Sequence, residues 1–263
     1  MLCIGMISFI VYTFMDKKLD KSIADEFKRS ESKESEESFS IKDIWFIINN
    51  KGWWYIALLC VLFYSAVFPF LKYASDLMVN KFGVDPELAG IIPGMLPFGT
   101  MILTPLFGNL YDRKGKGASI MILGALLLIF VHAMFSIPFL RATPIAIVLI
   151  IILGIGFSLV PSAMWPSVPK IIPEKQLGTA YALIFWVQNI GLMGVPALIG
   201  WVLNKYCITG TYLIDGSPVP SYNYTLPMII FTSFGVIALV FALLLKAEDK
   251  KKGYGLEMPN IKK

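Results

Sequence analysis

Long apolar runs separated by short polar segments dominate the sequence. A helix that crosses a bilayer needs about 20 apolar residues, whereas a transmembrane β-strand needs only about ten with alternating polarity. The runs are continuous rather than alternating, so they predict helices, whose backbone groups find partners within the segment. Six runs reach full length: 53–78, 88–110, 118–140, 143–168, 178–204 and 226–245.

Several prolines lie inside these runs, where each removes a backbone donor and crowds the preceding turn. We expect kinks or local unwinding at four of them: Pro93, Pro97, Pro105 and Pro161. Such breaks are tolerated in a membrane where a neighbouring helix or a cavity satisfies the freed backbone groups.

The remaining segments predict a simple domain order. Residues 1–15 are apolar but short of a full span and precede a charged cluster, so we interpret them as the end of a truncated transmembrane helix. Residues 16–52, charged and Ser-rich, predict a mobile or partly helical cytoplasmic linker that ends in an interfacial segment. Residues 53–245 form the predicted six-helix bundle and residues 246–263 a cytoplasmic tail. The predicted fold class is an all-α membrane protein.

Composition supports this fold class. Hydrophobic residues make up 56% of the chain and charged residues 16%, against about 25% charged in soluble domains. The net charge of +5 does not predict nucleic-acid binding, because the basic residues lie in loops, where they orient the chain and contact anionic headgroups. If residue 16 is cytoplasmic, inner segments carry 19 Lys and Arg and outer loops three, so both ends are predicted to be cytoplasmic.

Candidate chemistry inside the runs is sparse. Catalytic, phosphate-binding and zinc-binding motifs are missing from the sequence, so we predict no enzyme activity, no catalytic residue, no metal and no cofactor. The three cysteines, Cys3, Cys60 and Cys207, are far apart and are interpreted as two small buried hydrophobes and a loop thiol. His132 permits a proton-relay role, with a satisfied buried histidine as the simpler interpretation.

A short loop rich in glycine and charge follows the second full run, at residues 108–117 (GNLYDRKGKG). Gly108 permits close helix approach, and Asp112 can accept hydrogen bonds from a helix N-terminus. Gly115 allows a sharp turn, and basic residues such as Arg113 hold the loop on the cytoplasmic side. A generic basic turn between two helices is the alternative interpretation.

This loop resembles the signature of the major facilitator superfamily, G-x-x-x-D-R/K-x-G-x-K/R, which in that family follows helix 2 and again helix 8. One full span precedes the motif-bearing span and four follow it, so the resemblance implies helices 7 to 12 and an absent N-terminal half. Residues 163–168, 172–181 and 188–192 further resemble the lysosomal dipeptide transporter branch of the superfamily and its bacterial relatives. That resemblance implies a carrier of dipeptides or related amino acid derivatives.

The resemblance also implies a substrate site near the bilayer midplane, between two helical halves that rock around it. The candidates on this half are the aromatic residues Tyr64 and Phe68, the basic residue Lys72, and the amides Gln188 and Asn189. Each type has a structural alternative: core packing for the aromatics, snorkelling to the headgroups for the lysine, and hydrogen bonding between helices for the amides.

A second group of candidates lies on the cytoplasmic side. Trp165 and Pro166 end the fourth run and are expected to form an inner gate, with an interfacial tryptophan as the alternative. Asp112 and Arg113 are expected to form a charge cluster with Glu174 of the next cytoplasmic loop. The cluster would hold the cytoplasmic side of the carrier closed and would break when that side opens. Solvated loop charges are the alternative interpretation.

Two functions remain open at this level. The first is transmembrane solute transport by alternating access, with this chain supplying one half of the pathway. The second is a non-transporting membrane scaffold or accessory subunit. The expected partners are the lipid bilayer, a small-molecule substrate, and the missing N-terminal half or a second half-transporter. Short loops favour a bacterial inner membrane, and a lysosomal membrane is expected for a eukaryotic source, in which Asn223 would begin a glycosylation sequon.

Overall fold

The computed structural model describes residues 2–30, 41–214 and 217–261. The chain divides into two compact units, Met1–Ile41 and Lys42–Lys263. The first contains the helix α1 (Leu2–Ser30), which continues beyond residue 15 into the charged stretch. The rest of that stretch, residues 31–40, lies outside the described residues.

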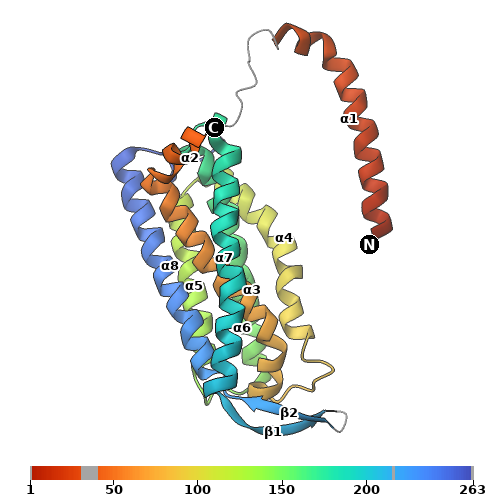
Figure 1. Ribbon diagram of the computed structural model, residues 1–263, viewed down its shortest axis with the longest axis vertical. Helices are drawn as coiled ribbons and strands as arrows, with labels where there is room; N and C mark the ends of the chain where they lie inside the picture. The colour runs from red at the N-terminus through yellow and green to blue at the C-terminus, as the bar shows by residue number, and fades with distance from the viewer. Residues whose placement is uncertain (1, 31–40, 215–216, 262–263) are drawn as a thin grey trace. The chain divides into compact units, whose positions relative to one another are not determined.

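The second unit is a bundle of long helices (Figure 1). Among the described residues, six helices are long and apolar enough to cross a membrane, which confirms the all-α membrane fold. They are α3 (Lys51–Phe82), α4 (Ile91–Lys114), α5 (Gly117–Ser136), α6 (Thr143–Ile171), α7 (Leu177–Tyr206) and α8 (Thr225–Lys252). A short helix, α2 (Ile41–Ile48), precedes α3, and a 3-10 turn, η1 (Glu174–Gln176), precedes α7.

The packing order makes α3 the central helix. It packs against α6, α7 and α8, while α5 packs against α6 and α8, and α4 against α6. Of the most apolar stretch of α3, 56% is buried, whereas the value is 17% for both α4 and α7. These two helices therefore expose long apolar faces, which suit contact with lipid or with another group of helices.

Local sequence explains several helix ends. The Asn50 side chain accepts a hydrogen bond from the Trp53 backbone N–H at 3.3 Å and caps the start of α3. Gly83, with φ of 63°, ends α3 in the left-handed conformation that glycine adopts most easily. The helix α8 continues to Lys252, past the predicted end at residue 245, because its charged last turns still favour helix.

The prolines do not interrupt their helices. Pro97 and Pro105 lie inside α4, and Pro161 lies inside α6, yet both helices are continuous. Pro93 lies in the first turn of α4, where a missing backbone donor costs little. Local unwinding is therefore not observed at these four prolines, and the kinks expected as the other outcome stay a prediction.

A β-hairpin that the sequence did not predict joins α7 to α8. Its strands β1 (Ile208–Ile214) and β2 (Ser217–Tyr222) pair antiparallel and lie at the end of the bundle opposite α2 (Figure 1). Pro218 and Pro220 argue against a strand, because proline cannot donate to a ladder and is confined to edges. A two-stranded sheet has only edges, so the hairpin tolerates both.

Candidate functional site

Aromatic side chains from α3, α6 and α7 meet on one face of the bundle. Tyr64 and Phe68 of α3 have ring centroids 5.6 Å apart, and each lies 5.5 Å from the ring of Phe157 on α6. Trp165 of α6 stacks on Phe185 of α7 at 4.9 Å and meets Tyr64 edge-on at 6.4 Å. The predicted pair on α3 thus joins a larger group, called here the aromatic face: Tyr64, Phe68, Phe157, Trp165 and Phe185.

Hydrogen bonds fix the centre of the aromatic face. The Trp165 indole Nε1–H donates to the Tyr64 hydroxyl oxygen at 3.2 Å. The Tyr181 hydroxyl of α7 donates to the Trp165 backbone carbonyl at 3.1 Å. The rings of Phe68 and Phe185 are 45% and 49% exposed, so the face is open on the side away from the core. Such a surface offers apolar stacking around a few oriented polar groups, which is typical of small-molecule sites.

The two candidate amides have different surroundings. Gln188 is 6% exposed, and the Cys60 thiol of α3 donates to its Oε1 at 3.5 Å. Asn189 is exposed, and its Nδ2 donates to the Phe185 carbonyl of its own helix at 2.8 Å. Gln188 therefore links α7 to α3 beside the aromatic face, whereas Asn189 lies at the surface of the unit.

Lys72 and its neighbour Asp76 are not joined in the structure. Lys72 is exposed, and among the described residues no ion pair links it to Asp76. The Asp76 carboxylate instead accepts a hydrogen bond from the Tyr224 hydroxyl, just before α8. Burial, together with this hydrogen bond, raises the pKa of Tyr224 above the usual tyrosine value.

The gate candidates on α6 lie inside a helix rather than at its end. The helix continues through Pro166 and Pro169 to Ile171, which corrects the expectation that Trp165 and Pro166 end the span. Trp165 is held by Tyr64, Tyr181 and Phe185, so its surroundings are other aromatic groups of the unit. A gating role remains a prediction for this residue, and no separate contact of Pro166 supports one.

The signature loop has an unexpected partner. The Asp112 carboxylate accepts from Asn260 Nδ2 in the C-terminal tail at 2.7 Å, while Arg113 is exposed. Within the described part of the chain, no ion pair joins Arg113 to Asp112 or to Glu174, which is exposed. Gly115 has φ of 70°, as a sharp turn requires, but no atom lies within 4 Å of a Cβ built on Gly108. Among the described residues, no other helix therefore makes the close approach that Gly108 was expected to permit.

Sequence reasoning missed Phe157, Phe185 and the tail residue Asn260. Helical spacing could have found the first two, because Phe185 lies three positions before Gln188 and Phe157 two turns before Trp165. Nothing in the sequence pairs Asn260 with Asp112, because 148 residues separate them.

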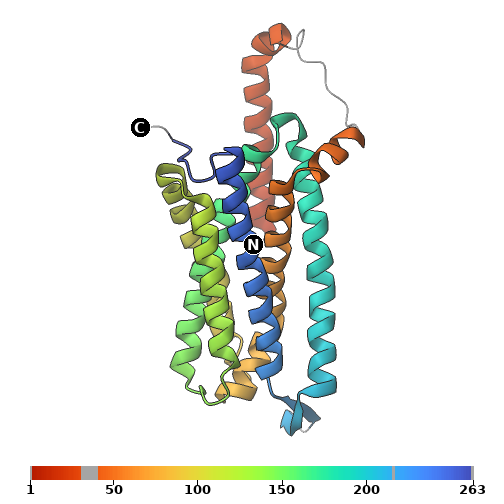
Figure 2. The same cartoon turned by 90° about the vertical axis from the view of Figure 1, so that its left-hand side faces the viewer.

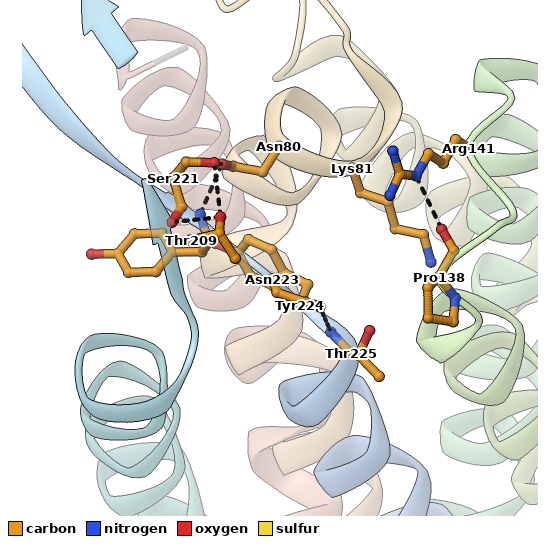
Figure 3. A pocket seen from close by; sticks show the side chains of 10 residues that line it. Asn80, Lys81, Pro138, Arg141, Thr209, Ser221, Asn223, Tyr224 and Thr225 are labelled. Atoms are coloured by element: carbon orange, nitrogen blue, oxygen red, sulfur yellow. Dashed lines mark hydrogen bonds between the residues drawn. The ribbon is translucent and has the colours of Figure 1, made fainter. Parts of the chain in front are cut away.

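A cavity of about 260 Å³ lies at the hairpin end of the bundle (Figure 3). Its lining includes two basic side chains, Lys81 at the end of α3 and Arg141 before α6. Lys81 donates to the carbonyls of Phe135 and Ile137, and Arg141 Nε donates to the Pro138 carbonyl at 3.1 Å. The bonds from Lys81 tie the end of α5 and the loop after it to α3, whereas the bond from Arg141 lies within that loop.

Comparison with known proteins identifies relatives for most of the chain. The family model of the Major Facilitator Superfamily matches residues 1–196. The lysosomal dipeptide transporter MFSD1 of Danio rerio is 28% identical over 200 residues, which cover 76% of this chain and 41% of that protein. MFSD1 of Homo sapiens is 33% identical over 153 residues, which cover 58% of this chain and 32% of that protein. The chain thus spans less than half the length of these curated relatives.

Solved structures share the fold. The crystal structure of a variant of the peptide transporter POT in complex with alafosfalin superposes with a TM-score of 0.62 at 16% identity, covering 80% of this chain and 40% of that chain. The same transporter in complex with sulfate gives a TM-score of 0.60 at 19% identity, again over 80% of this chain and 40% of that one. At this level of identity the likeness concerns the fold.

Proposed function

Because this chain belongs to the major facilitator superfamily, we propose that it supplies one six-helix half of a solute carrier whose pathway takes small peptides or related amino acid derivatives. The chain is a multi-pass integral membrane protein of a transporter family. Carriers of this fold bind substrate near the midplane, between two helical halves that rock around it. The relatives named as dipeptide transporters support the substrate class.

The aromatic face carries the proposal. It joins α3, α6 and α7, is partly exposed, and has the buried amide of Gln188 beside it. A peptide group has one N–H donor and one C=O acceptor, which an amide side chain matches with its own acceptor and donors. Aromatic rings add stacking and apolar contact for the side chains of the peptide. In this proposal Tyr64, Phe68 and Gln188 contact the substrate, and Trp165 shapes the cytoplasmic side of the site.

The exposed helices α4 and α7 suggest where the other half sits. Each has only 17% of its most apolar stretch buried within this unit. We place a second group of six helices against them, either in the same polypeptide or as a separate half-transporter. The compartment stays a prediction: a bacterial inner membrane or, in a eukaryote, the lysosomal membrane.

Transport by the longer protein tests the proposal. The DNA upstream of Met1 is read for six further spans, and the complete product is reconstituted in proteoliposomes with labelled dipeptides. We expect saturable uptake that the Gln188→Ala variant lowers about three- to tenfold, the effect of losing one hydrogen bond to the substrate. The control Leu243→Ala alters a half-exposed apolar side chain on α8 and leaves uptake unchanged.

The outcomes separate the parts of the proposal. Equal uptake with and without protein across a dipeptide panel contradicts the substrate class and favours a scaffold or accessory subunit. Normal uptake by the Gln188→Ala variant is compatible with a carrier function but shows that Gln188 does not contact the substrate.

A further inference from the structure

The C-terminal tail folds back onto the signature loop. After α8 ends at Lys252, the segment Gly253–Ile261, called here the strap, runs toward the turn between α4 and α5 (Figure 2). Its hydrogen bonds reach α4 at Asp112, the turn at Lys116, α5 at Ser119 and α6 at Lys170. The strap therefore connects four helices at the end of the bundle opposite the hairpin, counting α8.

The first part of the strap caps α5. Lys116, at the N-cap position, has φ of 64° and makes no side-chain capping bond. The carbonyl of Leu256 instead accepts from Gly117 N–H at 2.8 Å, and the carbonyl of Glu257 accepts from Lys116 N–H at 3.0 Å. The Glu257 carboxylate accepts from the backbone N–H and the hydroxyl of Ser119, both at 2.9 Å. A carboxylate at this position also suits the positive end of the helix dipole.

Two glycines of the signature loop make room for the strap. A Cβ on Gly115 would lie 2.5 Å from the Glu257 carbonyl oxygen, and one on Gly117 would lie 2.8 Å from the Leu256 carbonyl oxygen. Leu256 is fully buried, and its N–H donates to the Asp249 carboxylate at 3.1 Å. This part of the strap is thus an anchor held by close fit and burial.

The last part of the strap is an exposed tip. Asn260 and Ile261 donate their backbone N–H groups to the Asp112 carbonyl, each at 3.0 Å, and Asn260 Nδ2 donates to the Asp112 carboxylate at 2.7 Å. The side-chain contact is exposed to solvent, unlike the anchor. Exposed hydrogen bonds at a chain end open more readily than buried ones.

We propose that the strap is a two-part regulatory device in which Glu257 holds the signature loop permanently and Asn260 occupies Asp112 reversibly. While the tip is bound, Asn260 occupies Asp112 Oδ1, so a basic group of another loop must displace the tip before it can pair with both oxygens of this carboxylate. Release of the tip frees that carboxylate without unfolding the turn, because the anchor keeps α5 capped. Glu257 and Asn260 are thus positioning residues for Asp112, and the device does not depend on the identity of the substrate.

Hydrogen exchange of the whole chain in lipid nanodiscs, followed by mass spectrometry, tests the anchor. Glu257→Ala is expected to raise exchange of the amides of residues 117–119 about fivefold or more, the effect of losing a helix cap. Met258→Ala is the matched control, because its side chain is 66% exposed. Exchange in α3 reports whether the variant folds. If Glu257→Ala disturbs α3 as well, Glu257→Gln, which keeps the acceptor oxygen, replaces it and should raise exchange less than twofold.

Disulfide trapping tests the tip. The pair Asp112→Cys with Asn260→Cys is expected to cross-link under mild oxidation, and the two single variants serve as controls. In the same membranes, Asn260→Ala should raise alkylation of Asp112→Cys severalfold, while Glu257→Gln should not. Unchanged hydrogen exchange at residues 117–119 in the Glu257→Ala variant would contradict the proposal that Glu257 anchors the strap to α5. Absence of the cross-link, or equal alkylation of Asp112→Cys with and without Asn260, would contradict the proposal that the tip covers residue 112.

Discussion

At the scale of single residues, the direction in which a side chain leaves its helix decides which candidate residues lie together. Gln188 and Asn189 are adjacent on α7, but successive residues of a helix point about 100° apart. Gln188 consequently faces Cys60 of α3 and is buried, whereas Asn189 is exposed and bonds to its own helix. The sequence places both amides at midplane depth, and only the packing of α7 on α3 separates their roles.

Gly191 offers a test of that packing. A Cβ at Gly191 would lie 2.5 Å from Val61 Cγ2 and would also collide with the Ser65 hydroxyl, both on α3. Gly191→Ala is therefore expected to push α7 away from α3 and to cost about 1 to 3 kcal/mol of stability. A lower melting temperature of the purified protein in detergent measures the effect.

Gly194→Ala is the matched control, because no atom lies within 4 Å of a Cβ at Gly194. Both substitutions add the same methyl group to the same helix and gain the same helix propensity. Equal melting temperatures for the two variants would contradict the close approach of α7 and α3.

At the scale of elements, the hairpin acts as a clamp across helix ends. Asn80 of α3 accepts from the Ser221 hydroxyl at 2.8 Å and from the Tyr222 backbone N–H at 2.9 Å (Figure 3). The Tyr222 hydroxyl donates to Asn204 of α7 at 3.0 Å. Together with the bond from Tyr224 to Asp76, these contacts tie together the hairpin-side ends of α3, α7 and α8.

Tyr224→Phe is expected to loosen this clamp. It removes the hydrogen bond to the Asp76 carboxylate, and bonds to charged groups contribute about 1.5 to 3 kcal/mol. Tyr222→Phe is the control, because its bond to Asn204 is exposed and neutral and should contribute less. Thermal unfolding of both variants measures the difference. An equal loss of stability in the two would show that the negative charge of Asp76 does not strengthen the hydrogen bond from Tyr224.

The raised pKa of Tyr224 adds a pH dependence. The folded protein holds the proton of this hydroxyl more tightly than the unfolded chain does. Stability is therefore fully present below the unfolded value of about 10 and falls as the pH rises above it. Melting curves between pH 9 and about 11 should show a steeper loss for the native protein than for Tyr224→Phe. Parallel losses would contradict the assignment.

At the scale of the whole molecule, charge distribution and helix order agree. The end of the bundle with α2, η1 and the strap carries most of the basic residues, whereas Lys81, Arg141 and Lys205 lie at the hairpin end. The excess of basic residues at one end predicts that this end is cytoplasmic. The strap and the signature loop would then lie in the cytoplasm, and the hairpin on the opposite side.

Reporter fusions test this orientation. Alkaline phosphatase inserted in the hairpin after Thr211 is expected to be active, because that enzyme folds only on the outer side of a bacterial membrane. A fluorescent protein fused after Lys263 is expected to fluoresce, and phosphatase at the same place to be inactive. An active phosphatase after Lys263 would reverse the topology.

The sequence by itself determined the membrane class, the six spans and the family. These follow from run length, charge placement and one local motif, and none of them needs to know which helix touches which. It also placed Tyr64 and Phe68 on one face, because a single turn of helix fixes that relation.

Only the tertiary structure decided which groups meet across helices. Stacking of Trp165 on Phe185, the bond from Cys60 to Gln188, and the strap on Asp112 join residues of different helices or of a distant tail. It also put Pro166 inside a continuous helix and formed a hairpin from a proline-containing segment. The hydrophobic effect is non-directional, so it favours burial of a helix without fixing the rotation of the helix or its neighbour. Close packing and hydrogen-bond geometry determine the rotation and the neighbour.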